Sequence, residues 1–162
     1  MVDIQTVSIA IASAGVFVAA MYYVWQIRHQ TKLRHTDLIV RLFSTYMTDE
    51  FRDALAKVWN LRFKDYEEYE KKYGFMWSSE GPVPKAVSKV NIFFNGVGVL
   101  VKRKLVDIEL ADHMLAVSLT WEKVKPIIEG ARKQQNMPTY FGDFEYLYNE
   151  VKKREQKLQS KA

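Results

Sequence analysis

The residues of this chain that could do chemistry are three histidines, one Gly-x-Gly pair and a small group of carboxylates. His29 and His35 are six residues apart, about 600° of helix, so they face different directions. His113 stands next to Asp112, and adjacent residues on a helix do not converge on one ion. We therefore expect hydrogen-bonded or solvent-facing histidines and no metal site.

Gly96 and Gly98 form the Gly-x-Gly pair. A dinucleotide-binding fingerprint needs a preceding strand and a third glycine, whereas position 101 is Val. The carboxylates of residues 67–70 lie among Lys and Tyr, where no apolar cleft is visible to change their protonation. We interpret them as a solvated face. The sequence thus predicts no catalytic residue, no cofactor, no metal and no enzyme activity.

The composition favours one folded domain. The 162 residues are 48% hydrophobic, and the absence of cysteine excludes disulfides and Cys-based zinc sites. The net charge of +5 raises the possibility of nucleic-acid binding. However, the basic runs at residues 102–104 and 152–154 lie near the ends of apolar-striped segments, where cations complement the helix dipole. We expect no nucleic-acid partner.

The apolar spacing predicts an all-α fold. Residues 90–101 could form a hairpin at Asn95-Gly96, but a helical stripe from Val83 to Val101 favours a helix, in which Gly96 and Gly98 allow a neighbouring helix to approach. Pro126 lies off the next stripe, which predicts one kinked helix. The expected helices are residues 7–46, a helix capped by Thr48, one capped by Asp65 and ended by Gly74, 83–101, one running from Asp107 to Ala131, and a last one from Asp143 that frays beyond Lys152.

The first segment carries no charge over twenty-four residues, 4–27. A helix rises about 1.5 Å per residue, so roughly 20 apolar residues cross a bilayer core of about 30 Å. A cleaved signal peptide would need basic residues upstream, and Ala12-Ser13-Ala14 has none before it. A buried core helix is rarely apolar on every face for this length. We therefore predict a single transmembrane helix that continues into a helical bundle, with the alternative that Thr36 and Asp37 cap a new helix after a short break.

The flanks of this segment predict its orientation. Aromatic rings prefer the headgroup zone, and cytoplasmic flanks are rich in Lys and Arg. We expect residues 1–28 to be the anchor with the N-terminus outside, 29–158 a cytoplasmic helical domain and 159–162 a flexible tail. The predicted membrane-interface residues are Tyr22, Tyr23, Trp25, Arg28, Lys32 and Arg34.

Small residues line one side of the predicted membrane helix, at Ser8, Ala12, Gly15 and Ala19. Small side chains let transmembrane helices pack closely, although they are also common in such helices. The pattern is compatible with self-association or docking onto another membrane protein, and equally with neither.

Four stretches of the chain resemble a family of small membrane-anchored microbial proteins known only as a domain of unknown function. They are residues 22–31 with 36–39, residues 94–107, residues 121–126 and residues 145–148. The resemblance implies an N-terminal membrane helix and a helical soluble region, and it brings no activity, cofactor or catalytic residue.

We expect an accessory, scaffolding or assembly subunit of a membrane complex that acts through protein contacts. The alternative is an enzyme or a ligand sensor with a site inside the bundle. A third possibility, a membrane-tethered nucleic-acid binder, would require the separate basic runs to converge on one face.

Overall fold

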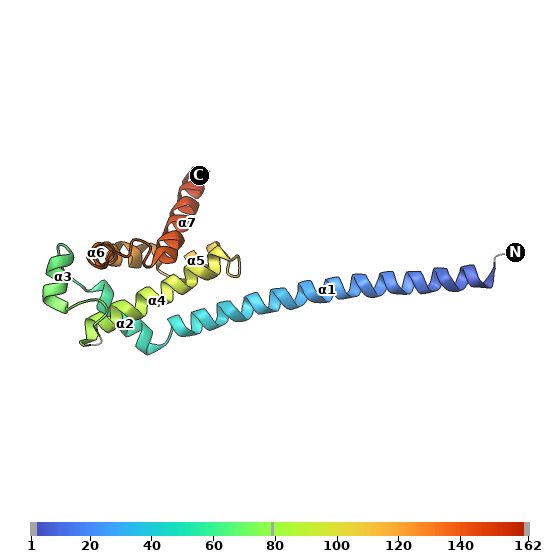
Figure 1. Ribbon diagram of the computed structural model, residues 1–162, viewed down its shortest axis with the longest axis horizontal. Coiled ribbons are helices and arrows are strands. Elements are labelled where there is room, and N and C mark those ends of the chain that lie inside the picture. Colours follow the sequence, from blue (N-terminus) through green and yellow to red (C-terminus); the bar gives the residue numbers. More distant parts are fainter. Residues whose placement is uncertain (1–2, 79, 161–162) are drawn as a thin grey trace. The chain divides into compact units, whose positions relative to one another are not determined.

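The computed structural model describes residues 3–78 and 80–160; in the first helix, the side chains of residues 6–11, 28 and 30–36 are outside the description. The described chain is all α-helical and contains no strand, as the sequence predicts. Its contacts divide after Leu38 into two units. The helices are α1 (Ile4–Tyr46), α2 (Asp49–Trp59), α3 (Tyr66–Tyr73), α4 (Pro82–Lys102), α5 (Ile108–Met114), α6 (Val117–Gln135) and α7 (Gly142–Gln159) (Figure 1).

Three of the predicted helix starts, at Thr48, Asp65 and Asp107, are confirmed at the level of individual hydrogen bonds. The Thr48 hydroxyl accepts the backbone N–H of Phe51 at 3.3 Å, and the Asp65 carboxylate accepts that of Glu68 at 2.9 Å. Each bond satisfies an N–H that the first turn of a helix leaves without an intrahelical partner. Gly74 ends α3 with φ +93°, a conformation that favours glycine.

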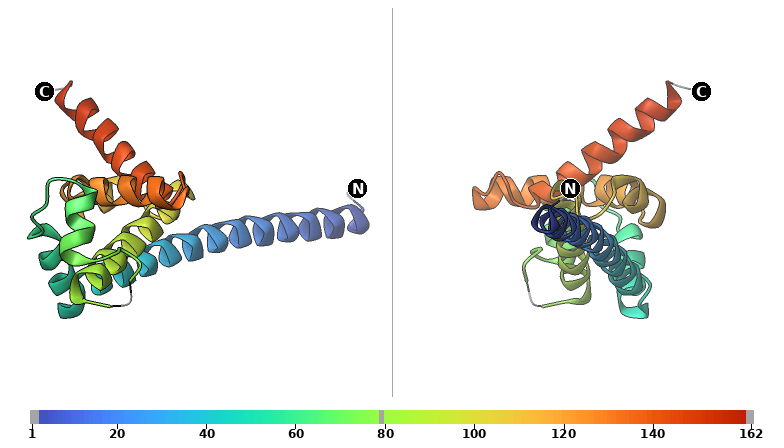
Figure 2. Two further views of the ribbon diagram at one scale, coloured as in Figure 1. Left: turned by 60° about the vertical axis from the view of Figure 1, so that its left-hand side comes forward. Right: turned by 90° about the vertical axis from the view of Figure 1, so that its right-hand side faces the viewer.

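Residues 82–102 form the helix α4. This confirms the helix that the apolar stripe predicts and excludes the alternative hairpin at Asn95-Gly96. The inward face of α4 is apolar except for the buried Asn91 and lies against α2, α6 and α7 (Figure 2). The Phe94 ring stacks on that of Phe144 in α7, with 4.9 Å between centroids and 12° between planes. The buried members of the stripe are Val87, Val90, Phe94, Val97 and Val101.

The glycine pair in α4 divides into one close contact and one open position. A Cβ atom on Gly98 would lie 2.0 Å from the carbonyl oxygen of Asp143, so α7 approaches the α4 backbone at this point. A Cβ atom on Gly96 would meet nothing within 4 Å. The predicted close approach is therefore confirmed at Gly98 and wrong at Gly96.

The single kinked helix predicted from Asp107 to Ala131 is wrong, because α5 and α6 are separate helices. Leu115 between them is extended, with φ −125° and ψ 135°, and its side chain is buried. The N–H of Ala116 donates to the Tyr46 hydroxyl at 3.4 Å. The break thus places Leu115 and Val117 together in the core. The Ala116 N–H, which no longer has an intrahelical partner, is bonded by the Tyr46 hydroxyl. Helix α6 then continues through Pro126.

The predicted fraying beyond Lys152 is wrong as far as Gln159, where α7 ends. Lys152 lies 3.7 Å from the Glu122 carboxylate of α6, and Arg154 lies 2.6 Å from that of Asp112 in α5. These contacts to other helices offset the tendency of a terminal turn to unwind. The last turns of α7 extend away from the rest of the second unit (Figure 2).

The two glycines of α4 provide a matched test of the α4–α7 contact. We expect Gly98→Ala to lower the free energy of unfolding by about 2 kcal/mol, because the added methyl group must push α7 away. Gly96→Ala should raise it by about 0.5–1 kcal/mol through helix propensity alone. Chemical unfolding followed by far-ultraviolet circular dichroism measures both, and equal effects of the two variants would contradict the described contact.

Candidate functional site

The described apolar stretch of α1 is exposed on all sides. Every side chain from residue 12 to residue 25 is exposed, including those of Val16, Phe17 and Val18, which are 66–70% accessible. Consecutive residues of an α-helix point about 100° apart, so three in a row already cover most of its circumference. This surface is therefore apolar all round and has no polar face that would mark a solvent side.

Aromatic rings lie together near the end of this stretch. The ring centroids of Tyr22 and Trp25 are 6.3 Å apart, and those of Trp25 and His29 are 5.8 Å apart. These residues are three and four positions apart, a spacing that brings side chains together on a helix surface. The structure thus places the predicted interface aromatics Tyr22 and Trp25 in one cluster, in which Tyr23 also contacts Tyr22.

The other predicted site residues of α1 are only partly described. Ala12, Gly15 and Ala19 are exposed, and a Cβ atom on Gly15 would meet nothing within 4 Å. The side chains of Ser8, Arg28, Lys32 and Arg34 lie outside the described residues. Within the residues that are described, no helix combines the length and the apolar composition that are needed to cross a membrane.

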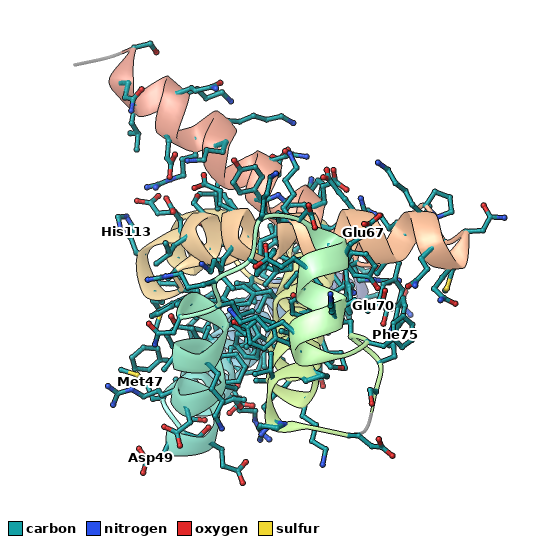
Figure 3. The ribbon with its side chains drawn as sticks, turned by 90° about the vertical axis from the view of Figure 1, so that its left-hand side faces the viewer. Met47, Asp49, Glu67, Glu70, Phe75 and His113 are labelled. Atoms are coloured by element: carbon teal, nitrogen blue, oxygen red, sulfur yellow. The ribbon has the colours of Figure 1, made fainter. Side chains whose placement is uncertain are left out.

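In the second unit, the titratable groups considered for chemistry lie apart. Figure 3 shows His113 well separated from Glu67 and Glu70. The His113 ring lies 3.7 Å from the Glu109 carboxylate, in an exposed ion network whose other members include Arg154 of α7. In the described part of the chain, no group of three or more His, Asp or Glu residues is arranged to hold a metal ion.

The loop after α3 covers one end of the core. Met76 is fully buried, and the Trp77 indole donates a hydrogen bond to the hydroxyl of Tyr140. Tyr140 belongs to the loop between α6 and α7, and its carbonyl accepts the Nε–H of Arg132 at 2.8 Å. These contacts tie two loops to the end of α6.

Three buried polar atoms of the described residues have no hydrogen-bond partner: Tyr69 Oη, Asn91 Oδ1 and Arg132 Nη2. Asn91 is completely buried, and its amide donates to the sulfur of Met76 at 3.6 Å. Burial, with smaller contributions from neighbouring tyrosines, raises the pKa of Tyr69 far above its ordinary value. The three atoms come from α3, α4 and α6, and no hydrogen bond links them into a common site.

The structure also contains a surface groove of about 500 Å³ between α2 and α4, which the sequence does not predict. Its floor contains Ala54 and Ala86, both at least 95% buried, and small side chains at a helix crossing leave a hollow at the surface. In the sequence, the spacing of apolar residues marks one inward face on α2 and one on α4. Spacing within a helix does not say which two helices pack against each other, so it does not predict the groove. The lining residues are Glu50, Ala54, Lys57, Gly81, Pro82, Lys85, Ala86 and Lys89.

The chain belongs to a family defined by a domain of unknown function. The profile of this family, described as Domain of unknown function (DUF4760), matches residues 9–151 and thus most of both units. This confirms the expected membership of an uncharacterised family. Comparisons with curated proteins and with solved structures gave no significant match.

Tyr69 gives the fold a testable dependence on pH. Its pKa is higher in the folded chain than the ordinary value of 10.0, so its contribution to stability is complete below about pH 10 and is lost as the pH rises toward the folded-state pKa. Tyr69→Phe should flatten this alkaline loss. It should also raise the free energy of unfolding at neutral pH by about 1 kcal/mol, because the hydroxyl has no partner.

Tyr66→Phe is the matched control for this experiment. Burial and then Glu70 raise the pKa of Tyr66 to about 12, but its hydroxyl donates to the Gln134 side chain at 2.8 Å. This variant should lose about 0.5–1 kcal/mol at neutral pH. Urea unfolding at a series of pH values measures both variants, and a loss of stability in Tyr69→Phe at neutral pH would contradict the unpartnered hydroxyl.

Proposed function

We propose that the protein is a membrane-anchored accessory or assembly subunit, held by its N-terminal helix and acting through protein contacts of its helical domain. The observation that carries the proposal is the uncharged run of residues 4–27 together with the all-round exposure of its described apolar side chains. A helix that is apolar on every face is stable only inside a protein core or a bilayer.

The length of the anchor supports a bilayer span when the sequence is counted in full. Residues 12–27 alone are short for a hydrocarbon core that takes roughly 20 residues. Residues 7–11, Val-Ser-Ile-Ala-Ile, precede them without a charge. The proposed span is residues 7–27, and it ends at the cluster of Tyr22 and Trp25.

The proposed orientation has the N-terminus outside and the helical domain in the cytoplasm. Lys and Arg in short flanks favour the cytoplasmic side. Arg28, Lys32 and Arg34 follow the span, whereas Asp3 is the one charged side chain before it. The aromatic cluster lies on the same side as the basic residues, where amphipathic rings suit the headgroup zone.

The core of the second unit supports a role in contacts over a role in catalysis. Among its described buried residues, only Asn91 and Thr120 are polar. Thr120 accepts the indole N–H of Trp59 at 3.2 Å and donates to the Ala116 carbonyl, so its hydrogen bonds belong to the fold. We propose another membrane protein or a second copy of the chain as the partner of the face formed by Ser8, Ala12, Gly15 and Ala19.

A charge placed in the apolar stretch should release the protein from membranes. We expect the double variant Phe17→Lys, Val18→Lys to shift from the membrane pellet to the soluble fraction, because each charge near a bilayer centre costs about 2.5–3.5 kcal/mol. Ile92→Lys, which changes an exposed apolar residue of the second unit, should stay in the pellet. Sedimentation of cell lysates followed by immunoblotting measures this, and retention of both variants would argue against a bilayer span.

The lack of cysteine makes the orientation simple to measure. We expect Asp3→Cys to react with a membrane-impermeant maleimide on intact cells. Ser160→Cys should react only after the cells are lysed, because the proposed domain faces the cytoplasm. The reverse labelling pattern would show that the orientation is wrong while leaving the span intact.

The accessory role is tested by isolating the native protein in a mild detergent. We expect a second membrane protein to co-purify in a fixed ratio, or the chain to elute as an oligomer of itself, and quantitative mass spectrometry of the purified fraction distinguishes these results. The double variant Ala12→Phe, Gly15→Phe should lose the association while remaining in the membrane, because bulky side chains keep helix backbones apart. A monomer without a partner would contradict the proposed role.

A further inference from the structure

The groove between α2 and α4 carries an excess of positive charge at its rim. Lys57 of α2 and Lys85 and Lys89 of α4 line it, against one carboxylate, that of Glu50. Glu80, which comes directly before the lining residue Gly81, is exposed. The Lys89 ammonium lies 3.3 Å from Glu50. Among the described residues, no carboxylate lies within 4.0 Å of Lys57 or Lys85.

This arrangement leaves a repulsion that an anionic partner would relieve. Lys85 and Lys89 are four residues apart on one helix, where like charges are destabilising by about 0.2–0.5 kcal/mol, and Glu50 offsets the charge of Lys89 alone. The first turn of α4 contains no acidic residue, so the positive end of its dipole adds to the potential of the lysines. The potential at the rim therefore favours carboxylates over ammonium groups.

The shape of the groove restricts the kind of partner. A flat bilayer surface does not enter a hollow whose floor is formed by Ala54 and Ala86. A free phosphate group is bound best by several converging charge-assisted donors, whereas the Lys89 side chain is 48% exposed and already lies 3.3 Å from the Glu50 carboxylate. An extended or helical peptide segment fits both the hollow and the exposed lysines at its rim. Small apolar side chains of the peptide would lie over the alanines, and its carboxylates would lie at the lysines.

We propose that the α2–α4 groove, defined by Lys57, Lys85, Lys89, Ala54 and Ala86, is the docking site for an acidic peptide segment of a partner protein. This inference deepens the proposed function, because it names the surface of the helical domain through which the accessory role operates. It does not depend on the membrane anchor.

A short fluorescein-labelled peptide of alternating Glu and Ala tests the groove in the full-length protein, purified in a neutral detergent. Fluorescence anisotropy should show salt-sensitive binding of this peptide and no binding of a Gln-Ala peptide of equal length. The triple variant Lys57→Gln, Lys85→Gln, Lys89→Gln should bind the Glu-Ala peptide about tenfold more weakly, because each exposed ion pair contributes up to about 1 kcal/mol.

A second triple variant removes the same charge elsewhere. Lys71, Lys133 and Lys157 are exposed lysines outside the groove, and their replacement by Gln should change the affinity less than about twofold. Equal losses in the two triple variants would reduce the effect to net charge and overturn the proposal. Absence of binding to the native chain would also overturn it.

Charge reversal keeps the test independent of any loss of folding. Lys85→Glu, Lys89→Glu should reverse the preference, so that a Lys-Ala peptide binds and the Glu-Ala peptide does not. If short-chain phosphatidylserine binds the native groove and the Glu-Ala peptide does not, the groove is a headgroup site and the proposal is wrong. Failure of peptide binding with intact membrane retention would refute the groove alone, whereas release from membranes would refute the anchor alone.

Discussion

The contact between α4 and α7 at Gly98 is the constraint on which the second unit depends. A Cβ atom there would lie 2.0 Å from the Asp143 carbonyl, so only glycine allows this separation. The same region of α4 also binds the first turn of α7, because the Asn95 amide oxygen accepts the backbone N–H of Phe144 at 3.2 Å. The Lys102 ammonium adds an ion pair with Asp143 at 2.9 Å. Helix α7 then carries the contacts that fix α5 and α6, through Arg154 and through the Phe144 ring.

Local patterns in the sequence predicted the helices, but not how they meet. Thr48, Asp65 and Asp107 act as helix caps, because capping depends on residues within one turn. The break at Leu115 does not follow from the sequence, since the apolar spacing is the same on either side, and the N–H of Ala116 that it frees is bonded by a tertiary contact with Tyr46. The extent of α7 does not follow from local patterns either, because Lys152 and Arg154 pair with residues of α6 and α5.

The candidate functional surfaces show the same limit. The run of uncharged residues 4–27 is continuous in the sequence and was recognised directly. The α2–α4 groove combines Lys57 with Lys85 and Lys89, which are separated by about thirty residues in the chain and meet only through packing of the two helices. From the spacing within one helix, such lysines are predicted to lie on a solvated face. Only the folded structure shows that there is a hollow between them.

The two units contrast in how they use apolar residues. In the second unit, the apolar faces of the helices are directed inward and form one core around Phe94, Trp121 and Phe144. In the first, apolar side chains cover the described helix on every side and remain exposed. The proposed bilayer anchor accounts for the exposed apolar side chains of the first unit. The proposed peptide-binding groove gives the second unit a surface for contact with a partner.

The most direct test of this account is alkaline carbonate extraction of membranes from cells that express either the full-length chain or a chain lacking residues 1–27. Carbonate removes peripheral proteins and leaves bilayer-spanning ones in the pellet. The account predicts that the full-length chain stays in the pellet and that the shortened chain, still folded by circular dichroism, is found in the soluble fraction. Retention of the shortened chain to the same extent as the full-length one would contradict it.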